Sequence, residues 1–263
     1  MSDASLYEVW SDALRTERPV ALATVIDGPD AGAKLLVERD GATVGSLGNA
    51  DLDRVVARDA LAELDMGLTE VRHYGARGEA RQADVSIFIE SRAPRPRMLI
   101  FGAVDFTRAL AQQAKFLGYH VTVCDAREVF ATRKRFPMAD EVVVDWPNRL
   151  LEQVGGELGP RDAVCVLTHD AKFDVPAITS ALRTRVGYIG AMGSRRTHST
   201  RSDRLREEGV TDEELDRILA PIGIDIGARS PEETAVSICA EIIALRTGRV
   251  AASLRDGEGP IHA

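Results

Sequence analysis

Short apolar runs alternate with longer amphipathic stretches through the second half of the chain. The apolar runs lie at residues 98–101, 121–124, 142–144, 164–167 and 186–189, and we expect a strand at each. Segments with helical spacing separate most of these runs. Strands that alternate with helices in this way are typical of a parallel sheet covered on both faces. The pattern predicts the α/β class, with a Rossmann-like doubly wound parallel sheet whose ligands bind beyond the carboxyl ends of the strands.

The first part of the chain has a mixed pattern instead. We expect helices at residues 4–15 and 52–64, where apolar side chains recur at helical spacing. Strands are expected at residues 20–26, 34–38, 43–47, 68–74 and 85–90, with a hairpin turn at Asp40-Gly41. These elements predict a smaller N-terminal α+β domain.

The boundary between the two patterns falls at residues 91–97, which read SRAPRPR. Two prolines in a polar, basic run favour a stiff linker with little apolar surface to bury. We therefore expect an N-terminal domain over residues 1–92 and a Rossmann-like domain over residues 97–263.

Composition and charge narrow the function. Hydrophobic residues make up 44% of the chain, enough for a sizeable core, and the formal net charge is −8. Nucleic-acid binders usually carry a basic surplus, so we expect no nucleic-acid partner. No run approaches the roughly 18 apolar residues of a membrane span, and the N-terminus lacks the apolar region of a signal peptide. We expect a cytoplasmic protein without membrane contact.

Basic residues cluster in one segment near residue 200. The cluster contains Arg195, Arg196, Arg201, Arg204 and Arg206. Acidic residues follow it at once, at Glu207 and Glu208. Mixed charges of this kind are typical of a solvated helix face.

The three cysteines, Cys124, Cys165 and Cys239, are far apart in the sequence. The chain has no Cys-x-x-Cys pair, which argues against a zinc site or a disulfide framework. Cys124 and Cys165 lie within apolar runs, where a buried, unreactive thiol is the usual state. No metal site and no catalytic residue are predicted.

The turn after the first Rossmann strand reads Gly102-Ala103-Val104-Asp105. A dinucleotide site needs a second glycine at the place of Val104, and an acid about 20 residues after the first glycine to bind the ribose. Asp125 lies 23 residues after Gly102 and meets the second requirement. Val104 would obstruct a pyrophosphate and Asp105 would repel it. The pattern favours a structural turn and leaves an NAD(P)-dependent oxidoreductase as an alternative.

Polar residues follow the next central strand, at Thr168, His169 and Asp170. The end of the strand would place them at the edge of the sheet where ligands bind. A histidine beside a carboxylate there could act as an acid, a base or a ligand. A loop histidine that bonds only to its neighbours remains the other interpretation.

The loop after the fifth strand is the best-formed candidate site. It contains Gly190, Gly193 and Ser194, and it opens a helix at Arg195 and Arg196. Glycines allow close approach, the first amides of a helix point outward, and the two arginines add positive charge. The segment predicts a site for an anion or a phosphate group.

A glycine-punctuated segment at residues 221–228 contains Gly223 and Asp225 and could lie over the cleft. Ser230, Pro231 and Glu233 then form a capping box, which predicts the start of the last helix.

Taken together, these motifs resemble the XdhC/CoxI family, the xanthine dehydrogenase accessory factors. The resemblance rests on residues 167–170, 188–197, 221–227 and 230–241, in that order, behind a degenerate Rossmann turn. The N-terminal part is similar to the family more weakly. Asp51 occupies the place of the family's cysteine, and Val104 and Asp105 replace its second glycine and its histidine. These departures make the chain resemble a divergent member.

The resemblance implies a chaperone that binds molybdenum cofactor (molybdopterin), protects it during sulfuration by a cysteine desulfurase, and delivers it to a molybdenum hydroxylase of the xanthine dehydrogenase or CO dehydrogenase type. Ser194, Arg195 and Arg196 could hold the pterin phosphate, and His169 and Asp170 could meet the pterin or the metal end. A homodimer is plausible. An interaction-only paralogue without a ligand is a further alternative, which Asp51 and Val104 favour.

Overall fold

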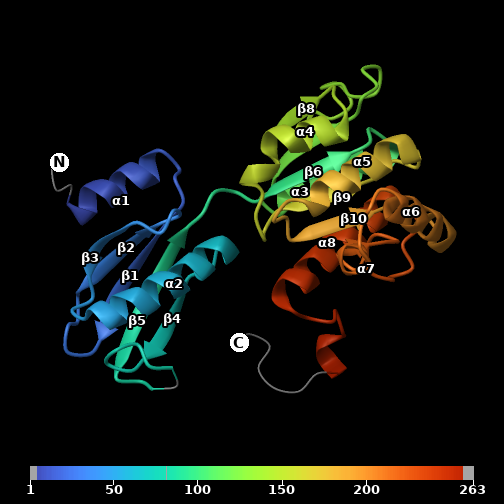
Figure 1. The fold of residues 1–263 in the computed structure, drawn as a ribbon. Helices are drawn as coiled ribbons and strands as arrows, with labels where there is room; N and C mark the ends of the chain where they lie inside the picture. The colour runs from blue at the N-terminus through green and yellow to red at the C-terminus, as the bar shows by residue number, and fades with distance from the viewer. Residues whose placement is uncertain (1–4, 81, 257–263) are drawn as a thin grey trace. The chain divides into compact units, whose positions relative to one another are not determined.

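The computed structural model describes residues 5–80 and 82–256. The chain divides into two compact units, Met1–Pro94 and Arg95–Ala263, and each unit has its own sheet and its own core (Figure 1).

The first unit contains an antiparallel five-stranded sheet in the order β3-β2-β1-β5-β4. Its strands are β1 (Val20–Asp27), β2 (Lys34–Glu38), β3 (Thr43–Ser46), β4 (Glu70–Tyr74) and β5 (Val85–Arg92). The expected hairpin at Asp40-Gly41 joins β2 to β3 and is confirmed. Gly41 has a φ of +89°, a backbone conformation that glycine adopts at little cost.

Two helices cover opposite faces of this sheet. Successive residues of a strand point to opposite sides, so one strand contributes side chains to the contacts with both helices. The helices are α1 (Leu6–Arg15) and α2 (Ala50–Met66). Ala21 and Ala23 of β1 belong to the core beneath α2, whereas Val20 packs with Ala13 of α1. Ser5 caps α1, and Ala4, the expected first helical residue, lies outside the described residues.

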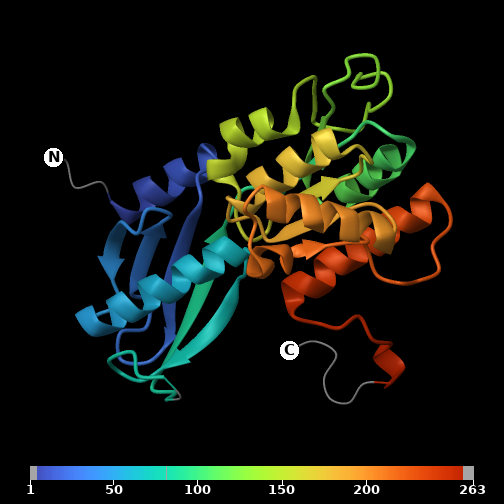
Figure 2. The same ribbon diagram turned by 45° about the vertical axis from the view of Figure 1, so that its right-hand side comes forward.

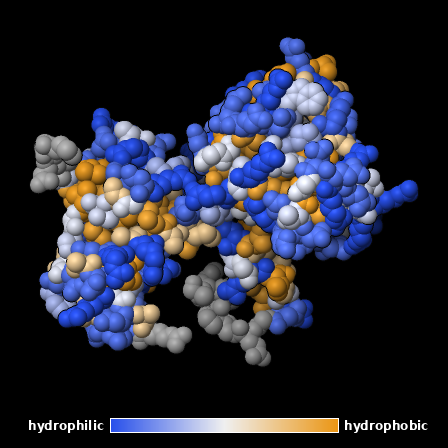
Figure 3. All heavy atoms as spheres, in the orientation of Figure 1, coloured by the Kyte–Doolittle hydropathy of each residue, from blue (hydrophilic) through white to orange (hydrophobic). Residues whose placement is uncertain are grey.

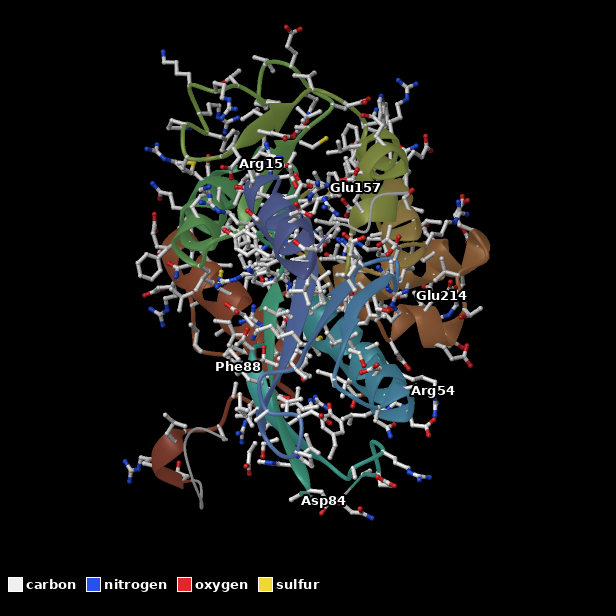
Figure 4. The ribbon with its side chains drawn as sticks, turned by 90° about the vertical axis from the view of Figure 1, so that its left-hand side faces the viewer. Arg15, Arg54, Asp84, Phe88, Glu157 and Glu214 are labelled. Atoms are coloured by element: carbon white, nitrogen blue, oxygen red, sulfur yellow. The ribbon has the colours of Figure 1, made fainter. Side chains whose placement is uncertain are left out.

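The turn from β4 to β5 closes one end of the sheet. Figure 4 shows Asp84 at this turn and Phe88 further along β5. The backbone amide of Asp84 donates to the carbonyl of Tyr74 at 3.0 Å, which fixes the register of the two strands.

The linker is shorter than the sequence predicts. The strand β5 continues through Arg92, and β6 (Arg97–Phe101) follows, so only residues 93–96 lie between the two sheets' strands. Ser91 and Arg92 pair with β1. The prediction of a linker over residues 91–97 is therefore wrong at both ends. The polar residues there belong to strands because their backbones pair with neighbouring strands, which the side-chain pattern does not reveal.

The second unit contains a parallel six-stranded sheet in the order β11-β10-β9-β6-β7-β8. The remaining strands are β7 (His120–Cys124), β8 (Glu141–Val143), β9 (Ala163–Val166), β10 (Tyr188–Ala191) and β11 (Ile218–Leu219). The chain runs outward from β6 through β7 to β8 and then returns to β9 on the other side of β6. The predicted doubly wound Rossmann-like sheet is confirmed, and so is the smaller α+β unit that precedes it in the chain.

Helices cover both faces of the parallel sheet (Figure 2). One face carries α3 (Asp105–Phe116) and α8 (Pro231–Thr247), and the other carries α4 (Pro147–Val154), α5 (Ala171–Leu182) and α6 (Arg195–Glu207). Met98 and Ile100 of β6 face the first set, while Leu99 and Phe101 face the second. A short helix, α7 (Asp212–Leu215), and two 3-10 turns, Gly155–Glu157 and Leu254–Asp256, complete the unit.

The capping box that begins α8 is confirmed: the Ser230 hydroxyl accepts from the Glu233 amide, and the Glu233 carboxylate accepts from the Ser230 amide. Hydrophilic residues cover most of the face of the second unit that Figure 3 shows. Within the described ranges, no helix has the length and apolar character needed to cross a membrane.

Glu63 is a buried acid of the first unit, with 1% of its surface exposed, and it forms an ion pair with Arg72. Burial raises the pKa of Glu63 to about 7, although the charge of Arg72 opposes the rise. A raised pKa means that the folded state holds the proton more tightly than the unfolded state. Stability is therefore lost as pH rises from about 4.5 to about 7, and the full loss is present above pH 7.

We expect Glu63→Gln to increase the free energy of unfolding at pH 8 by on the order of 1–3 kcal/mol, and to change it little near pH 4.5. Urea unfolding in a Trp146→Phe background, where Trp10 reports on this unit, measures the effect. Glu70→Gln is the control, because Glu70 also contacts Arg72 but its side chain is 44% exposed. A loss of stability in Glu63→Gln at pH 8 would contradict the assignment.

Candidate functional site

The parallel strands bring four of the sequence motifs to one edge of the second unit's sheet. The loops that follow β6, β7, β9 and β10 all leave the sheet at its carboxyl edge. The strand order reverses between β6 and β9, and ligands of doubly wound sheets bind at such a reversal.

The turn after β6 lies against the loop after β9. Gly102 has a φ of +107°, and a Cβ built on it would lie 2.6 Å from Thr168 Cγ2 and 3.1 Å from the Thr168 backbone nitrogen. The Thr107 hydroxyl donates to the Gly102 carbonyl and holds the turn from the other side. A contact within the protein therefore explains the glycine, without any need for a ligand.

Val104 and Asp105 begin α3. The Val104 amide donates to Thr107 Oγ1 at 3.3 Å. Asp105 is the first residue of the helix, where the helix dipole stabilises a negative charge. The Asp105 side chain is 94% exposed and lies 3.9 Å from Arg135. Both residues line a cavity of about 280 Å³. At this turn a dinucleotide-binding fold needs a glycine in the place of Val104.

Asp125, the candidate ribose acid at the end of β7, is bound within the protein. Its Oδ1 accepts from the amide and Nε of Arg127, both at 2.9 Å, and its Oδ2 accepts from Arg127 Nη2 and the Ala103 amide, both at 2.8 Å. Burial acts to raise the pKa of Asp125, but these hydrogen bonds outweigh it and hold the pKa below the usual value. A ribose hydroxyl would have to displace one of these donors.

A buried network joins the loops after β9 and β10. Arg201 Nη2 of α6 donates to Asp174 Oδ2 of α5 and to the Met192 carbonyl, both at 2.8 Å, and the Thr168 hydroxyl donates to Asp174 Oδ1. The side chains of Arg201 and Asp174 are each 3% exposed. Burial raises the pKa of Asp174, and the bonds from Thr168 and Arg201 oppose the rise. One ion pair thus fixes two helices and two loops.

The prediction that the arginine cluster is a solvated helix face is wrong for Arg201. Arg201 is 4% exposed because the acid Asp174 reaches it from the neighbouring helix. The sequence did carry a signal for this pair: Asp174 stands directly between Phe173 and Val175, on the apolar side of an amphipathic helix. A lone acid at such a position usually has a partner.

His169 and Asp170 do not form a dyad. Asp170 caps α5, accepting from the Lys172 amide at 3.1 Å and pairing with Lys172 Nζ at 3.3 Å. The Lys172 amide is the main cause that lowers the pKa of Asp170. Within the described ranges no hydrogen bond joins the two residues, and His169 instead lines a cavity together with Asp174.

The loop after β10 keeps its glycines for steric reasons. A Cβ on Gly190 would lie 2.5 Å from Ile222 Cδ1, and Gly193 has a φ of +143°. The Ser194 hydroxyl accepts from the Thr197 amide at 3.1 Å and caps α6. The helix start expected at Arg195 is confirmed.

Arg195 and Arg196 are the first two residues of α6, and both are exposed. In the part of the chain that the structure describes, neither forms an ion pair. Arg196 lines the cavity that His169 also lines.

The segment that contains Gly223 and Asp225 is tied to α8. The Gly223 amide and the Tyr188 hydroxyl both donate to Glu241 Oε2, at 2.9 Å and 2.6 Å. Asp225 Oδ1 accepts from the Gly227 amide at 3.3 Å and forms a local turn. These contacts give both residues a structural role in the loop.

A cationic cavity of about 290 Å³ lies between α5 and α6, which run side by side in Figure 2. Its lining includes His169, Asp174, Arg196, Thr200, Arg201 and Arg204. Of the residues singled out as ligand contacts from the sequence, only His169 and Arg196 line it. Arg204 was expected only as a member of the solvated arginine cluster, and nothing in the local sequence singled out Thr200.

The thiols are unavailable for chemistry at the surface. Cys124, Cys165 and Cys239, the only cysteines of the chain, are all buried. Burial raises the pKa of Cys124 and of Cys239 to about 12 and that of Cys165 as well. Across residues 5–80 and 82–256, no group of three His, Cys, Asp or Glu side chains could hold a metal ion.

Asp51 lies in the first turn of α2, in the first unit. Its side chain is 60% exposed and lies 3.4 Å from Arg54, which Figure 4 labels on the same helix. Asn49 caps the helix by accepting from the Asp51 amide at 2.9 Å.

A doubly wound sheet with a cationic cavity at its carboxyl edge, preceded in the chain by an antiparallel α+β unit, defines a two-unit protein whose second unit has a Rossmann-type fold. Residues 98–242 match the family model described as the XdhC Rossmann domain, and residues 13–75 match that of the XdhC and CoxI family. The first match alone spans more than half of the chain. The chain belongs to the XdhC/CoxI family, as the sequence motifs predicted.

Three relatives place the chain further. It is 28% identical over 253 residues to "Uncharacterized protein YqeB" of Escherichia coli, covering 90% of this chain and 46% of that protein. It is 32% identical over 195 residues to a probable xanthine dehydrogenase subunit of Bacillus subtilis, covering 68% and 56%. It is 30% identical over 153 residues to "Molybdenum cofactor insertion chaperone PaoD" of Escherichia coli, covering 58% and 41%. The chain spans about half the length of these relatives.

A solved structure has the same fold. The crystal structure of a xanthine dehydrogenase from Bacillus halodurans superposes with a TM-score of 0.54 at 22% identity, covering 95% of this chain and 98% of that one.

We expect Asp174→Asn to lower the free energy of unfolding by about 3–5 kcal/mol, because it leaves the buried charge of Arg201 without a partner. Urea unfolding in a Trp10→Phe background measures the loss, since Trp146 contacts Phe173 of α5 with ring centroids 5.0 Å apart. Asp212→Asn is the matched control: it removes an exposed partner of Arg206 and should cost about 1 kcal/mol or less. Equal, small losses in both variants would show that the buried pair does not hold the edge together.

Proposed function

We propose that the protein is an accessory factor that binds molybdenum cofactor and supports its insertion into a molybdenum hydroxylase. The observation that carries the proposal is a cationic cavity at the carboxyl edge of a Rossmann unit, in a member of the XdhC/CoxI family. One relative is named for molybdenum cofactor insertion and another for xanthine dehydrogenase. The terminal phosphate of molybdopterin is an anion that arginines hold well.

The proposed contacts come from two loops. Arg196 lines the cavity, and Ser194 and Arg195 stand next to it in the chain at the start of α6; we assign all three to the phosphate. His169 and Asp170 are assigned to the pterin or the metal end. The remaining proposed residues, Gly102, Val104, Asp105, Asp125, Thr168, Gly190, Gly193, Gly223 and Asp225, shape the loops at this edge. No residue is assigned a catalytic role, because binding and delivery need no covalent step.

The state of the cysteines bears on how sulfur reaches the cofactor. A cysteine takes up sulfur from a donor by nucleophilic attack of its thiolate, and buried thiols with a pKa raised to about 12 remain protonated at neutral pH. We therefore assign the sulfur donor to a partner, a cysteine desulfurase, while this protein holds the cofactor. The client is a hydroxylase of the xanthine dehydrogenase or CO dehydrogenase type, in the cytoplasm, and the accessory factor acts as a monomer or a homodimer.

Equilibrium binding to anaerobically prepared molybdenum cofactor tests the proposal, with NADH and NADPH titrated in parallel. We expect stoichiometric binding of the cofactor and no binding of either nucleotide. The Asp125 carboxylate that would bind the ribose is already bound by Arg127, and Val104 stands where the pyrophosphate would need a glycine. Binding of a nicotinamide nucleotide alone would replace the proposal with an oxidoreductase. Binding of none of the three would leave an interaction-only protein, which a pull-down with the hydroxylase would identify.

We expect Arg195→Ala to weaken cofactor binding by about 1–3 kcal/mol, through the loss of a charge-assisted hydrogen bond to the phosphate. The melting temperature should stay nearly unchanged, since Arg195 is exposed and unpaired in the described part of the chain. Arg206→Ala serves as the control from the same helix. Unaltered affinity would remove Arg195 from the site, and a large fall in melting temperature would make its role structural.

A further inference from the structure

We propose that the cavity between α5 and α6 is a built site for a phosphate-type oxyanion, with the buried Arg201 as its inner cation and Arg196 and Arg204 as its outer cations. The preference for an oxyanion follows from the side chains that line the cavity. Its assignment to the phosphate of molybdopterin rests on the proposed function.

Arg201 is held in place with one donor group left over. Its Nη2 bonds to Asp174 and Met192 at 2.8 Å, and its Nε lies 3.3 Å from Asp174 Oδ2. Its Nη1 is shielded from solvent and has no acceptor within the described ranges. A buried donor without a partner costs about 1–3 kcal/mol. Since Arg201 lines the cavity, an oxyanion bound there can supply the missing acceptor.

The charge of the lining suits a dianion. Three arginines and one acid, Asp174, face the cavity, which gives a formal charge of about +2 on a chain whose net charge is −8. Arg196 and Arg204 form no ion pair in the part of the chain that the structure describes. Arg206 of the same helix, by contrast, is paired with both Asp203 and Asp212. The helix therefore pairs Arg206, which does not line the cavity, and leaves Arg196 and Arg204, the two exposed arginines at the cavity, without an acidic partner among the described residues.

The spacing of the donors places them on one helix face. Thr197 lies three and four residues before Thr200 and Arg201, and these two lie four and three residues before Arg204. Residues at such spacings point to the same side of a helix. The site thus depends on side chains along α6 and not only on its first amides. His169, from the loop after β9, lines the same cavity.

The size of the cavity limits the ligand. Its volume of about 290 Å³ is at the lower end of the roughly 300–1,000 Å³ of small-molecule sites. It accommodates a phosphate group with a small adjoining part of a ligand, and a whole dinucleotide would have to extend outside it.

Titration of the full-length protein with inorganic phosphate at constant ionic strength, followed by calorimetry and ³¹P NMR, tests the site. We expect saturable binding that weakens about 10- to 100-fold in Arg204→Gln and in Arg196→Gln, each of which removes one charge-assisted hydrogen bond. Arg206→Gln removes the same charge from the same helix and should bind as the parent does. No saturable binding, or equal weakening in all three variants, would overturn the site.

Arg201→Lys tests the inner cation, because lysine keeps the charge and loses the fork of donors. We expect weaker phosphate binding with a retained near-ultraviolet circular dichroism spectrum. If this variant fails to fold, Arg196→Gln and Arg204→Gln still decide the question, since both side chains are exposed.

Competition identifies the source of the oxyanion. Displacement of phosphate by metal-free molybdopterin, but not by ADP, supports the assignment to the cofactor. Displacement by ADP alone supports the site and contradicts that assignment. Tight cofactor binding that Arg204→Gln leaves unchanged would contradict the assignment of this site to the cofactor while leaving the proposed function intact. Phosphate binding without cofactor binding would support the site and contradict the proposed function.

Discussion

The ion pair between Asp174 and Arg201 is the contact on which the carboxyl edge of the Rossmann sheet depends. It joins α5 to α6, and the same two side chains bind Thr168 after β9 and the Met192 carbonyl after β10. Thr168 in turn lies against Gly102, so the turn after β6 takes its shape from the same contact. A buried charge pair adds little net stability but is costly to break. Here it sets the positions of three loops relative to one another.

This arrangement changes what a Rossmann edge can bind. In dinucleotide folds the backbone of a glycine-rich turn and a free carboxylate contact the ligand. In this protein the turn is filled by Val104 and by its neighbouring loop, and the carboxylates of Asp125 and Asp170 are bound to Arg127 and Lys172. Arg196 and Arg204 of α6, by contrast, form no ion pair with any residue that the structure describes. The edge is therefore suited to hold an anion by side-chain charge, and the fold is retained while its usual ligand contacts are replaced.

The sequence predicted the fold well because apolar periodicity reflects burial directly. The alternation of strands and helices in the second unit, the hairpin at Asp40-Gly41 and the capping box at Ser230 each depend on neighbours in sequence. The features it missed depend on neighbours in space. Arg201 looks like a surface residue until Asp174 is placed beside it, and the two-residue strand β11 carries no pattern at all. Ser91 and Arg92 look like a linker until β1 pairs with them. His169 and Arg196 were singled out because strand ends and helix starts can be read from local sequence.

The buried cysteines allow the opening of the second unit to be measured by the rate at which they are alkylated. All three belong to the second unit, on β7, β9 and α8, and the first unit has none. An alkylating reagent reacts with an exposed thiolate, and these thiols become available only when the Rossmann core separates. The rate of alkylation in native buffer therefore measures the opening of one unit of a two-unit chain without a label. A bound ligand that stabilises that core slows the rate in proportion, which gives a way to detect ligands that leave the spectrum unchanged.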